Sequence, residues 1–284
     1  MIPAQFDYAA PTSVDEALAL LGEHGDDAKL IAGGQSLLPV LRMRLNAPEM
    51  VIDLSRIDAL KGISDAGDHL AIGALTRHCD IATDDLVDQH ATLLAKAVRQ
   101  VADNQVRHLG TIGGAVAHAD PAGDYGAPLR ALGASFVIAG PSGSRTVGAD
   151  EFFLDLFETA MGEDEILTEI HVPKHTGWGA EYLKFVRVAQ QWPIVAVGAM
   201  VRCSGNVIDE ARVGLTNMGS TPMRARATEA ALVGVTATED GVRAACELAA
   251  DDTSPPSDLN GDSDYRKHLA RVLTRRAVLK AAGA

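Results

Sequence analysis

The chain has few of the residues that build metal clusters and disulfide frameworks. It contains three cysteines in 284 residues, Cys79, Cys203 and Cys246, and they stand far apart. No CxxC or mixed Cys/His spacing occurs, so the sequence predicts no zinc site and no iron–sulfur cluster of its own. An odd, scattered set of cysteines also favours a reducing cytoplasm over an oxidising compartment.

Basic residues and long apolar runs are also scarce. There are 25 Lys and Arg against 38 Asp and Glu, which gives a formal net charge of −13 at pH 7. This balance argues against a nucleic-acid surface, which needs clustered cations. No apolar run reaches the ~18 residues of a membrane span, and the first residues lack the features of a signal peptide. We therefore expect a cytoplasmic protein, without a membrane span, that binds small molecules or other proteins.

What the chain does have is enough apolar sequence, 47%, for substantial cores. At about 150 residues per domain, its length predicts two domains. In residues 1–56, Ser13 and Glu16 predict the start of a helix over 14–25. Strands over 29–32 and 50–55 and a helix over 37–45 complete a small α/β unit.

Two further regions come after this unit, with a boundary that we expect near residues 174–178. The patterns of the first predict strands over 69–75, 134–140, 145–149 and 165–173 and a helix over 93–102. Those of the second predict strands over 181–189, 194–203 and 206–217, then helices over 223–234, 238–251 and 265–282.

Two glycine pairs carry the chemistry that the sequence suggests. The first glycine segment, residues 32–36, reads AGGQS, and the second glycine segment, residues 111–115, reads TIGGA. Glycines let backbone N–H groups approach an anion, and successive N–H groups can hold a phosphate. Asp124 comes after the second segment, and carboxylates suit ribose hydroxyls. Each pair alone is ordinary turn chemistry, but together they suggest two cradles around one diphosphate-bearing ligand.

Five stretches of sequence carry a resemblance to a known family. They read PTSVDEAL, AGGQSLLPVLRMRL, QVRHLGTIGGAVAHADPAGD, VAQQWPIV and TPMRARATEAALVG, in that order. The chain resembles the FAD-binding medium subunits of the molybdenum hydroxylases, which include aerobic carbon monoxide dehydrogenase and xanthine dehydrogenase-type enzymes. The resemblance covers essentially the whole chain and is far more specific than either glycine pair.

The resemblance implies an α+β fold. Residues 1–174 would form a vanillyl-alcohol-oxidase (PCMH)-type FAD-binding domain of two α/β subdomains, about 1–56 and 57–174. Residues 178–284 would form the CO dehydrogenase flavoprotein C-terminal domain, a three-stranded antiparallel sheet with a helical bundle.

The resemblance also implies where non-covalent FAD is held. The two glycine segments would bind its pyrophosphate, mostly through backbone amides, and Asp124 its sugar or adenine side. Leu167, Lys184 and Val101 would lie near the flavin. The implied FAD-binding residues are Leu30, Ile31, Ala32, Gly33, Gly34, Gln35, Ser36, Leu37, Val101, Gly110, Thr111, Gly113, Gly114, Ala115, Ala119, Asp120, Asp124, Leu167, Lys184 and Trp192. No catalytic residue and no metal ligand is implied in this chain.

Several positions depart from the family pattern or allow two interpretations. Gln35 stands where many members carry His, Ala115 replaces Asn or Ser, and Gln191 stands where Asp often precedes an aromatic residue. These changes bear on redox tuning and leave the glycines intact. Trp192 fits a residue that stacks near the flavin and a core or interface tryptophan equally well. The histidines His78 and His118 suit acid–base chemistry less well than packing or hydrogen bonding.

The resemblance implies an electron-transfer subunit of an oxidoreductase. Partners would be a small subunit with two [2Fe–2S] clusters and a large molybdopterin subunit that oxidises the substrate, in a dimer of heterotrimers. Electrons would pass through the clusters to FAD and on to an external acceptor. The alternative is a stand-alone FAD-dependent oxidoreductase or oxidase, which would need its own substrate pocket with a catalytic Tyr, His or Arg.

Overall fold

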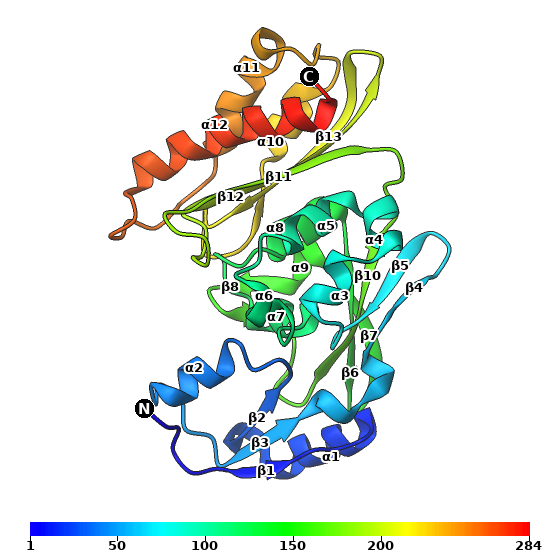
Figure 1. The fold of residues 1–284 in the computed structure, drawn as a ribbon, viewed down its shortest axis with the longest axis vertical. Coiled ribbons are helices and arrows are strands. Elements are labelled where there is room, and N and C mark those ends of the chain that lie inside the picture. Colours follow the sequence, from blue (N-terminus) through cyan, green and yellow to red (C-terminus); the bar gives the residue numbers. More distant parts are fainter.

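The N-terminal unit, residues 1–56, is built on a three-stranded parallel sheet. The computed structural model describes all 284 residues, and this unit lies at the bottom of Figure 1, in blue. Its strands, in the order β1-β3-β2, are β1 (Asp7–Ala9), β3 (Met50–Asp53) and β2 (Ala28–Ile31). Helix α1 (Val14–His24) begins as predicted, because the Ser13 side chain accepts a hydrogen bond from the Glu16 N–H.

The second helix of this unit is shorter than the sequence predicts. Helix α2 (Leu37–Arg42) ends three residues before the predicted limit at residue 45. Arg44 adopts a φ of 56°, in the left-handed region, so the helix cannot continue through it. Five residues separate the end of β2 from the first residue of α2, and they form the first glycine segment.

The middle unit, residues 57–174, has a five-stranded antiparallel sheet covered by short helices. Its order is β4-β5-β10-β6-β7, and the strands are β4 (Ile63–Asp65), β5 (His69–Gly73), β10 (Ile166–Pro173), β6 (Ser135–Gly140) and β7 (Gly143–Gly148). A small hairpin of β8 (Phe153–Asp155) and β9 (Glu158–Thr159) leads back to β10. The helices are α3 (His78–Ala82), α4 (Asp85–His90), α5 (Thr92–Val98), α6 (Asn104–Arg107), α7 (Ile112–His118), α8 (Gly126–Leu132) and α9 (Ala149–Phe152).

Two expectations for the middle unit are corrected. The helix predicted over 93–102 is α5, and it ends earlier than predicted, at Val98. The second glycine segment, whose glycine pair alone suggested a turn, opens a helix, because its glycines form the first turn of α7. Thr111 caps that turn with its side-chain oxygen, and the cap overrides the low helix propensity of the two glycines.

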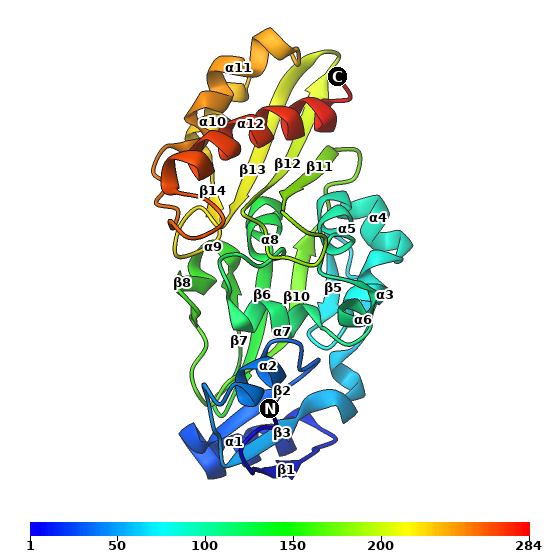
Figure 2. The same cartoon turned by 60° about the vertical axis from the view of Figure 1, so that its left-hand side comes forward.

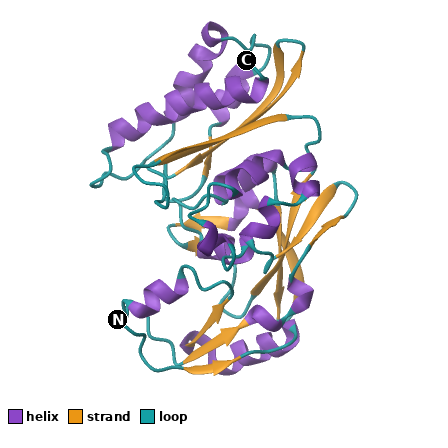
Figure 3. Cartoon of the chain, in the orientation of Figure 1, coloured by secondary structure: helices purple, strands orange, loops and turns teal.

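The C-terminal unit, residues 178–284, stacks on the helices of the middle unit (Figure 3). Its three long antiparallel strands are β11 (Gly179–Phe185), β12 (Val195–Ser204) and β13 (Val207–Thr216), as predicted. A two-residue strand, β14 (Met223–Arg224), extends the sheet beside β13, where the sequence predicted helix. Helices α10 (Arg226–Leu232), α11 (Glu239–Glu247) and α12 (Ser263–Ala282) complete the unit.

The C-terminal sheet is buried on both faces. Val195, Val197 and Ala199 point into a core with α12, which crosses the strands in Figure 2. The alternate residues Ala196 and Met200 belong to the core of the middle unit, beneath α5 and α8. Because side chains alternate along a strand, one sheet serves two cores. None of the helices combines the length and the apolarity needed to cross a bilayer.

Candidate functional site

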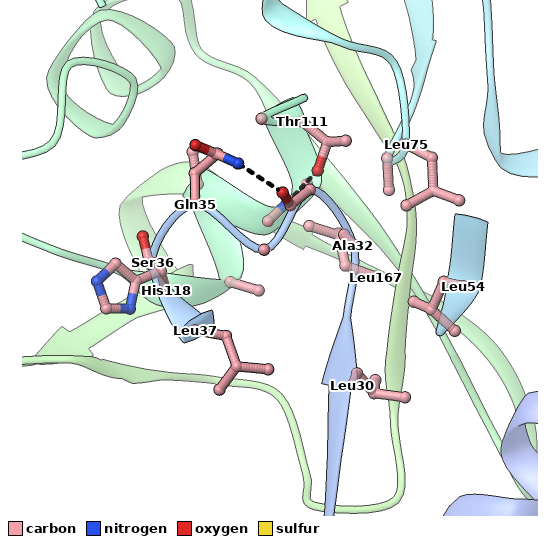
Figure 4. Close-up of a pocket in the computed structure, with 18 of the residues that line it drawn as sticks. Leu30, Ala32, Gln35, Ser36, Leu37, Leu54, Leu75, Thr111, His118 and Leu167 are labelled. Carbon is pink, nitrogen blue, oxygen red and sulfur yellow. Dashed lines mark hydrogen bonds between the residues drawn. The ribbon is translucent and has the colours of Figure 1, made fainter. Parts of the chain in front are cut away.

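A cavity of about 440 Å³ lies between the N-terminal and middle units. Thirteen of the twenty implied FAD-binding residues line it: Leu30, Ala32, Gly33, Gly34, Gln35, Ser36, Leu37, Gly110, Thr111, Gly113, Gly114, Ala115 and Leu167. In Figure 4, Leu54 and Leu75 stand at one end of this cavity, and Ser36 and His118 stand at the other. Both glycine segments, nearly 80 residues apart in the chain, meet in its wall.

The first glycine segment presents backbone donors that the protein leaves unused. It connects β2 to α2 and turns at Gly34, whose φ of 69° favours glycine. Gln35 Nε2 donates to the Gly33 carbonyl at 3.0 Å and closes the turn (Figure 4). The backbone N–H groups of residues 33–37 donate to no acceptor within the protein, and the Ser36 hydroxyl caps nothing. Five consecutive donors therefore remain available on the wall of the cavity.

The backbone N–H groups of the second glycine segment mostly donate to acceptors within the protein. Gly113 N–H donates to the Ala74 carbonyl at 2.8 Å, and Ile112 N–H donates to the Thr76 carbonyl at 3.1 Å. Gly114 N–H donates to Thr111 Oγ1 at 3.2 Å, and Ala115 N–H donates to the Thr111 carbonyl at 3.1 Å. The expectation that this segment binds the pyrophosphate mostly through backbone amides stays a prediction, and the amides of residues 112–115 already have partners within the protein. The second segment offers the Thr111 hydroxyl hydrogen and the Thr111 N–H, which has no acceptor in the protein.

The missing side chains of the glycines serve different contacts. A Cβ on Gly33 would collide with the Leu109 carbonyl oxygen and lie 2.6 Å from Gly110 Cα, and one on Gly113 would lie 2.6 Å from the Ala74 carbonyl oxygen. These two glycines therefore allow backbone to pack against backbone. A Cβ on Gly114 would meet only Thr111 Oγ1 at 3.0 Å and Ala32 Cβ at 3.7 Å. Gly114 is exposed and keeps the cavity wall low.

The floor of the cavity is apolar. Its side chains include Leu30, Leu37, Leu54, Leu75 and Leu167, which come from both units. Flat aromatic rings bind well in such surroundings. Free amide donors, hydroxyls and an apolar floor together fit a ligand that joins a diphosphate to an aromatic ring, as FAD does.

His78 is the most deeply buried polar side chain of the cavity wall. It is 4% exposed, and its Nδ1 lies 2.7 Å from the buried hydroxyl of Tyr125. Burial, reinforced by the nearby cation Arg107, lowers the pKa of His78 from 6.5 to about 4. The imidazole is therefore neutral at pH 7.

Six of the implied FAD-binding residues do not line the cavity. They lie where the middle unit meets the C-terminal unit, or on a neighbouring loop. They are Val101, Ala119, Asp120, Asp124, Lys184 and Trp192, and a seventh, Ile31, lies in β2 behind the first segment. Trp192 is 60% exposed on the loop between β11 and β12, so it is not a core tryptophan.

Asp124, expected at the sugar or adenine side of FAD, lies in a buried cluster of polar side chains, and its contact with FAD stays a prediction. Its Oδ2 pairs with Lys184 Nζ at 2.7 Å, and its Oδ1 accepts from the Tyr182 hydroxyl at 2.7 Å. Burial raises the pKa of Asp124, and the contacts with Lys184 and Tyr182 oppose that rise. Lys184 also donates to the Gln100 carbonyl at 3.0 Å. The pair joins β11 to the middle unit, and neither residue lines the cavity.

Sequence reasoning missed part of the cavity wall. The residues not foreseen as ligands are Lys29, Val40, Leu54, Ala74, Leu75, His78, Ala117, His118, Met161 and Ile166. Leu54 had a usable signal, because it comes directly after β3, the parallel neighbour of β2, and parallel strands end at one edge. Ala74 and Leu75 had none, since they reach the cavity only when the middle unit docks.

The chain contains no group of three or more His, Cys, Asp or Glu side chains arranged to hold a metal ion. The cavity wall itself includes no Asp, Glu, Tyr or Arg. His78 and His118 are its two imidazole side chains, and Lys29 is its one lysine.

Comparisons with known proteins agree with this geometry. The family model described as "FAD binding domain in molybdopterin dehydrogenase" matches residues 4–175, and "CO dehydrogenase flavoprotein C-terminal domain" matches residues 180–281. The carbon monoxide dehydrogenase medium chain of Hydrogenophaga pseudoflava is 43% identical over 98% of this chain and 97% of its own length. The glyceraldehyde dehydrogenase medium chain of Sulfolobus acidocaldarius is 36% identical over 98% of each chain.

A solved structure gives the same result for the fold. A chain of carbon monoxide dehydrogenase from Hydrogenophaga pseudoflava superposes with a TM-score of 0.96 at 44% identity, over 100% of this chain and 99% of the other. The FAD-type fold and the oxidoreductase family expected from the sequence are thereby confirmed. The chain belongs to the FAD-binding medium subunits of the molybdenum hydroxylases, the family that contains the medium chain of carbon monoxide dehydrogenase.

Proposed function

We propose that this chain is the electron-transfer subunit of a cytoplasmic molybdenum hydroxylase complex and holds FAD in the cavity between its first two units. The observation that carries the proposal is the row of five unused N–H donors at residues 33–37, on a wall kept low by Gly114. Neutral backbone donors suit a diphosphate, since they bind anionic oxygens without side-chain ordering. Bound FAD would supply reversible electron uptake and release.

The residues divide the work of holding the cofactor. The first glycine segment and the hydroxyls of Ser36 and Thr111 would bind the diphosphate. The leucine floor, with Leu30 and Leu167, would hold one aromatic ring. FAD has a second ring system, and Val101, Asp120, Lys184 and Trp192, beyond the end of α7, remain our candidates for its surroundings.

The composition of the cavity favours electron transfer over independent substrate oxidation. An oxidase that acts alone needs a base or an anion-binding side chain beside its substrate. Asp, Glu, Tyr and Arg are absent from this wall, its one lysine, Lys29, is exposed, and its most buried histidine is hydrogen-bonded to Tyr125. Related medium chains are named for carbon monoxide and for glyceraldehyde, which supports placing the substrate on another subunit.

An electron-transfer role requires partner subunits that deliver the electrons. The three cysteines are free and dispersed, and no group of three or more His, Cys, Asp or Glu side chains is arranged to hold a metal ion. We therefore propose that a small subunit with two [2Fe–2S] clusters delivers electrons and that a large subunit carries molybdopterin, in a dimer of heterotrimers. The chain would act as two domains, 1–174 and 178–284, and would receive the electrons after the iron–sulfur clusters.

The test compares the isolated chain with the assembled complex. The isolated chain, reconstituted with FAD, should keep its flavin absorption through gel filtration. Carbon monoxide, aldehydes and purines should not reduce the flavin bound to this isolated chain. Addition of the small and large subunits should allow one of these substrates to reduce the flavin in an anaerobic stopped-flow experiment. Multiple turnovers by the isolated chain would refute the proposal in favour of a stand-alone oxidase.

A further inference from the structure

The imidazole of His78 has one nitrogen inside the protein and one that faces the cavity. Its Nδ1 lies 2.7 Å from the Tyr125 hydroxyl. Its Nε2 has no hydrogen-bond partner in the protein, yet it is not sealed from solvent. The ring occupies the space that Gly110 leaves free, because a Cβ there would lie 2.7 Å from Nε2. His78 thus stands directly behind the start of the second glycine segment.

The hydrogen-bond partner of Nδ1 fixes which nitrogen carries the proton. Tyr125 is 3% exposed, and its hydroxyl has no other partner in the protein. If Nδ1–H donated to the phenol oxygen, the phenol hydrogen would be buried without an acceptor, which is unfavourable. The phenol therefore donates to Nδ1, and the proton of the neutral ring sits on Nε2.

We infer that His78 is a further FAD-binding residue, whose Nε2–H donates a hydrogen bond to an oxygen of the cofactor between its two ring systems. This inference rests on the proposed FAD cavity. The low pKa of His78, set by burial and by Arg107, agrees with a ring that donates while neutral. Tyr125 is then a positioning residue, because it touches His78 and not the cavity.

The tautomer can be tested in the FAD-free chain. Two-bond ¹H–¹⁵N correlation spectra at about pH 7 should show His78 as the neutral Nε2–H form. In Tyr125→Phe, which loses the fixed donor, the two tautomers should mix. A wild-type His78 found as the Nδ1–H form would overturn the inference without reference to FAD.

The contact is tested by titrating FAD into variants of the full chain. His78→Leu, which fills the space without a donor, should raise the FAD dissociation constant about tenfold, and Tyr125→Phe should raise it a few-fold. His78→Gln, whose Nε2 amide replaces the donor, should stay within about threefold of wild type. His108→Gln, an exposed histidine outside the cavity, is the matched control and should not change it.

The binding results separate the two proposals. FAD should also shift the Nε2 resonance of His78 more than its Nδ1 resonance. A folded His78→Leu chain that binds FAD like wild type would reject the His78 contact and leave the proposed function standing. A wild-type chain that fails to bind FAD would overturn both.

Discussion

The two glycine segments have nearly the same composition and opposite uses. Each combines two adjacent glycines with one hydroxyl residue, yet the first leaves the N–H groups of residues 33–37 free and the second pairs those of residues 112–115. The difference lies in where the glycines stand relative to the next helix. In the first segment they precede α2, whereas in the second they form the first turn of α7.

Helix geometry explains why the N–H groups of the second segment need partners. The first N–H groups of any helix lack partners within it. In α7 the Thr111 hydroxyl takes one, and the carbonyls of Ala74 and Thr76, just past β5, take two more. The second segment is thus tied to the middle unit by its own hydrogen bonds, whereas the first segment keeps donors that a ligand could use. Substitutions can separate these roles.

The largest effect is expected where the two segments touch. Gly33→Ala would drive its Cβ into the Leu109 carbonyl and to 2.6 Å from Gly110 Cα, and backbone cannot rotate away. We expect loss of FAD retention, and destabilisation by about 1–3 kcal/mol, measured by gel filtration with FAD and by urea unfolding. Gly22→Ala, with nothing within 4 Å in helix α1, is the control and should be neutral or stabilising. A Gly33→Ala chain that retains FAD would mean that the contact between the segments is dispensable.

Acid should act on the second segment through His78. The folded-state pKa is about 4 and the unfolded value is 6.5, so the unfolded chain takes up the proton first as the pH falls. Stability is therefore fully present above about pH 6.5 and is lost toward pH 4, by roughly 3 kcal/mol at about 1.4 kcal/mol per pKa unit. Urea unfolding of the FAD-free chain should show this loss, and His78→Gln should remove much of it. Equal acid sensitivity in both chains would assign the loss to other groups.

Within α7, neighbouring glycines should separate stability from binding. Gly113→Ala places a Cβ 2.6 Å from the Ala74 carbonyl oxygen and should lower the free energy of unfolding by about 1–3 kcal/mol. Gly114→Ala places its Cβ 3.0 Å from Thr111 Oγ1, a side-chain atom that can shift slightly, and should cost much less stability than Gly113→Ala. Its methyl group would stand on the cavity wall and weaken FAD binding about tenfold, as measured by flavin fluorescence. If both substitutions changed only stability, the second segment would be structural and nothing more.

Much of the fold was predictable, because it depends on local patterns. The Ser13 cap, the apolar run of residues 195–201 and the long helix near the C-terminus all depend on neighbouring residues. The site was predictable only in part. A glycine pair predicts that another group comes close to the backbone, but it does not show whether that group is a ligand or another part of the protein. Whether an N–H group is free depends on Ala74 and Thr76, residues just past a strand far from Gly113 in sequence. The burial of the Asp124–Lys184 pair likewise depends on docking between two units.

The smallest effects should come from the hydroxyls of Ser36 and Thr111. These two side chains test the difference between the two glycine segments most directly. Thr111→Val removes an N-cap that accepts from Gly114 N–H and should cost about 1 kcal/mol of stability. Ser36→Ala removes a hydroxyl with no hydrogen bond to the protein, so stability should stay within about 0.5 kcal/mol of wild type. Ser36→Ala should instead raise the FAD dissociation constant about fivefold, the worth of one hydrogen bond.

Thr111→Ser, which keeps the cap, is the matched control for Thr111→Val and should restore most of the lost stability. Differential scanning fluorimetry without FAD and FAD titration on the same four chains would give both quantities. The comparison requires that the stability loss fall on the second segment and the pure binding loss on the first. A Ser36→Ala chain that unfolds more easily but binds FAD normally would reverse the roles assigned here, since the first hydroxyl would then belong to the fold and the unused donors of residues 33–37 would need another purpose.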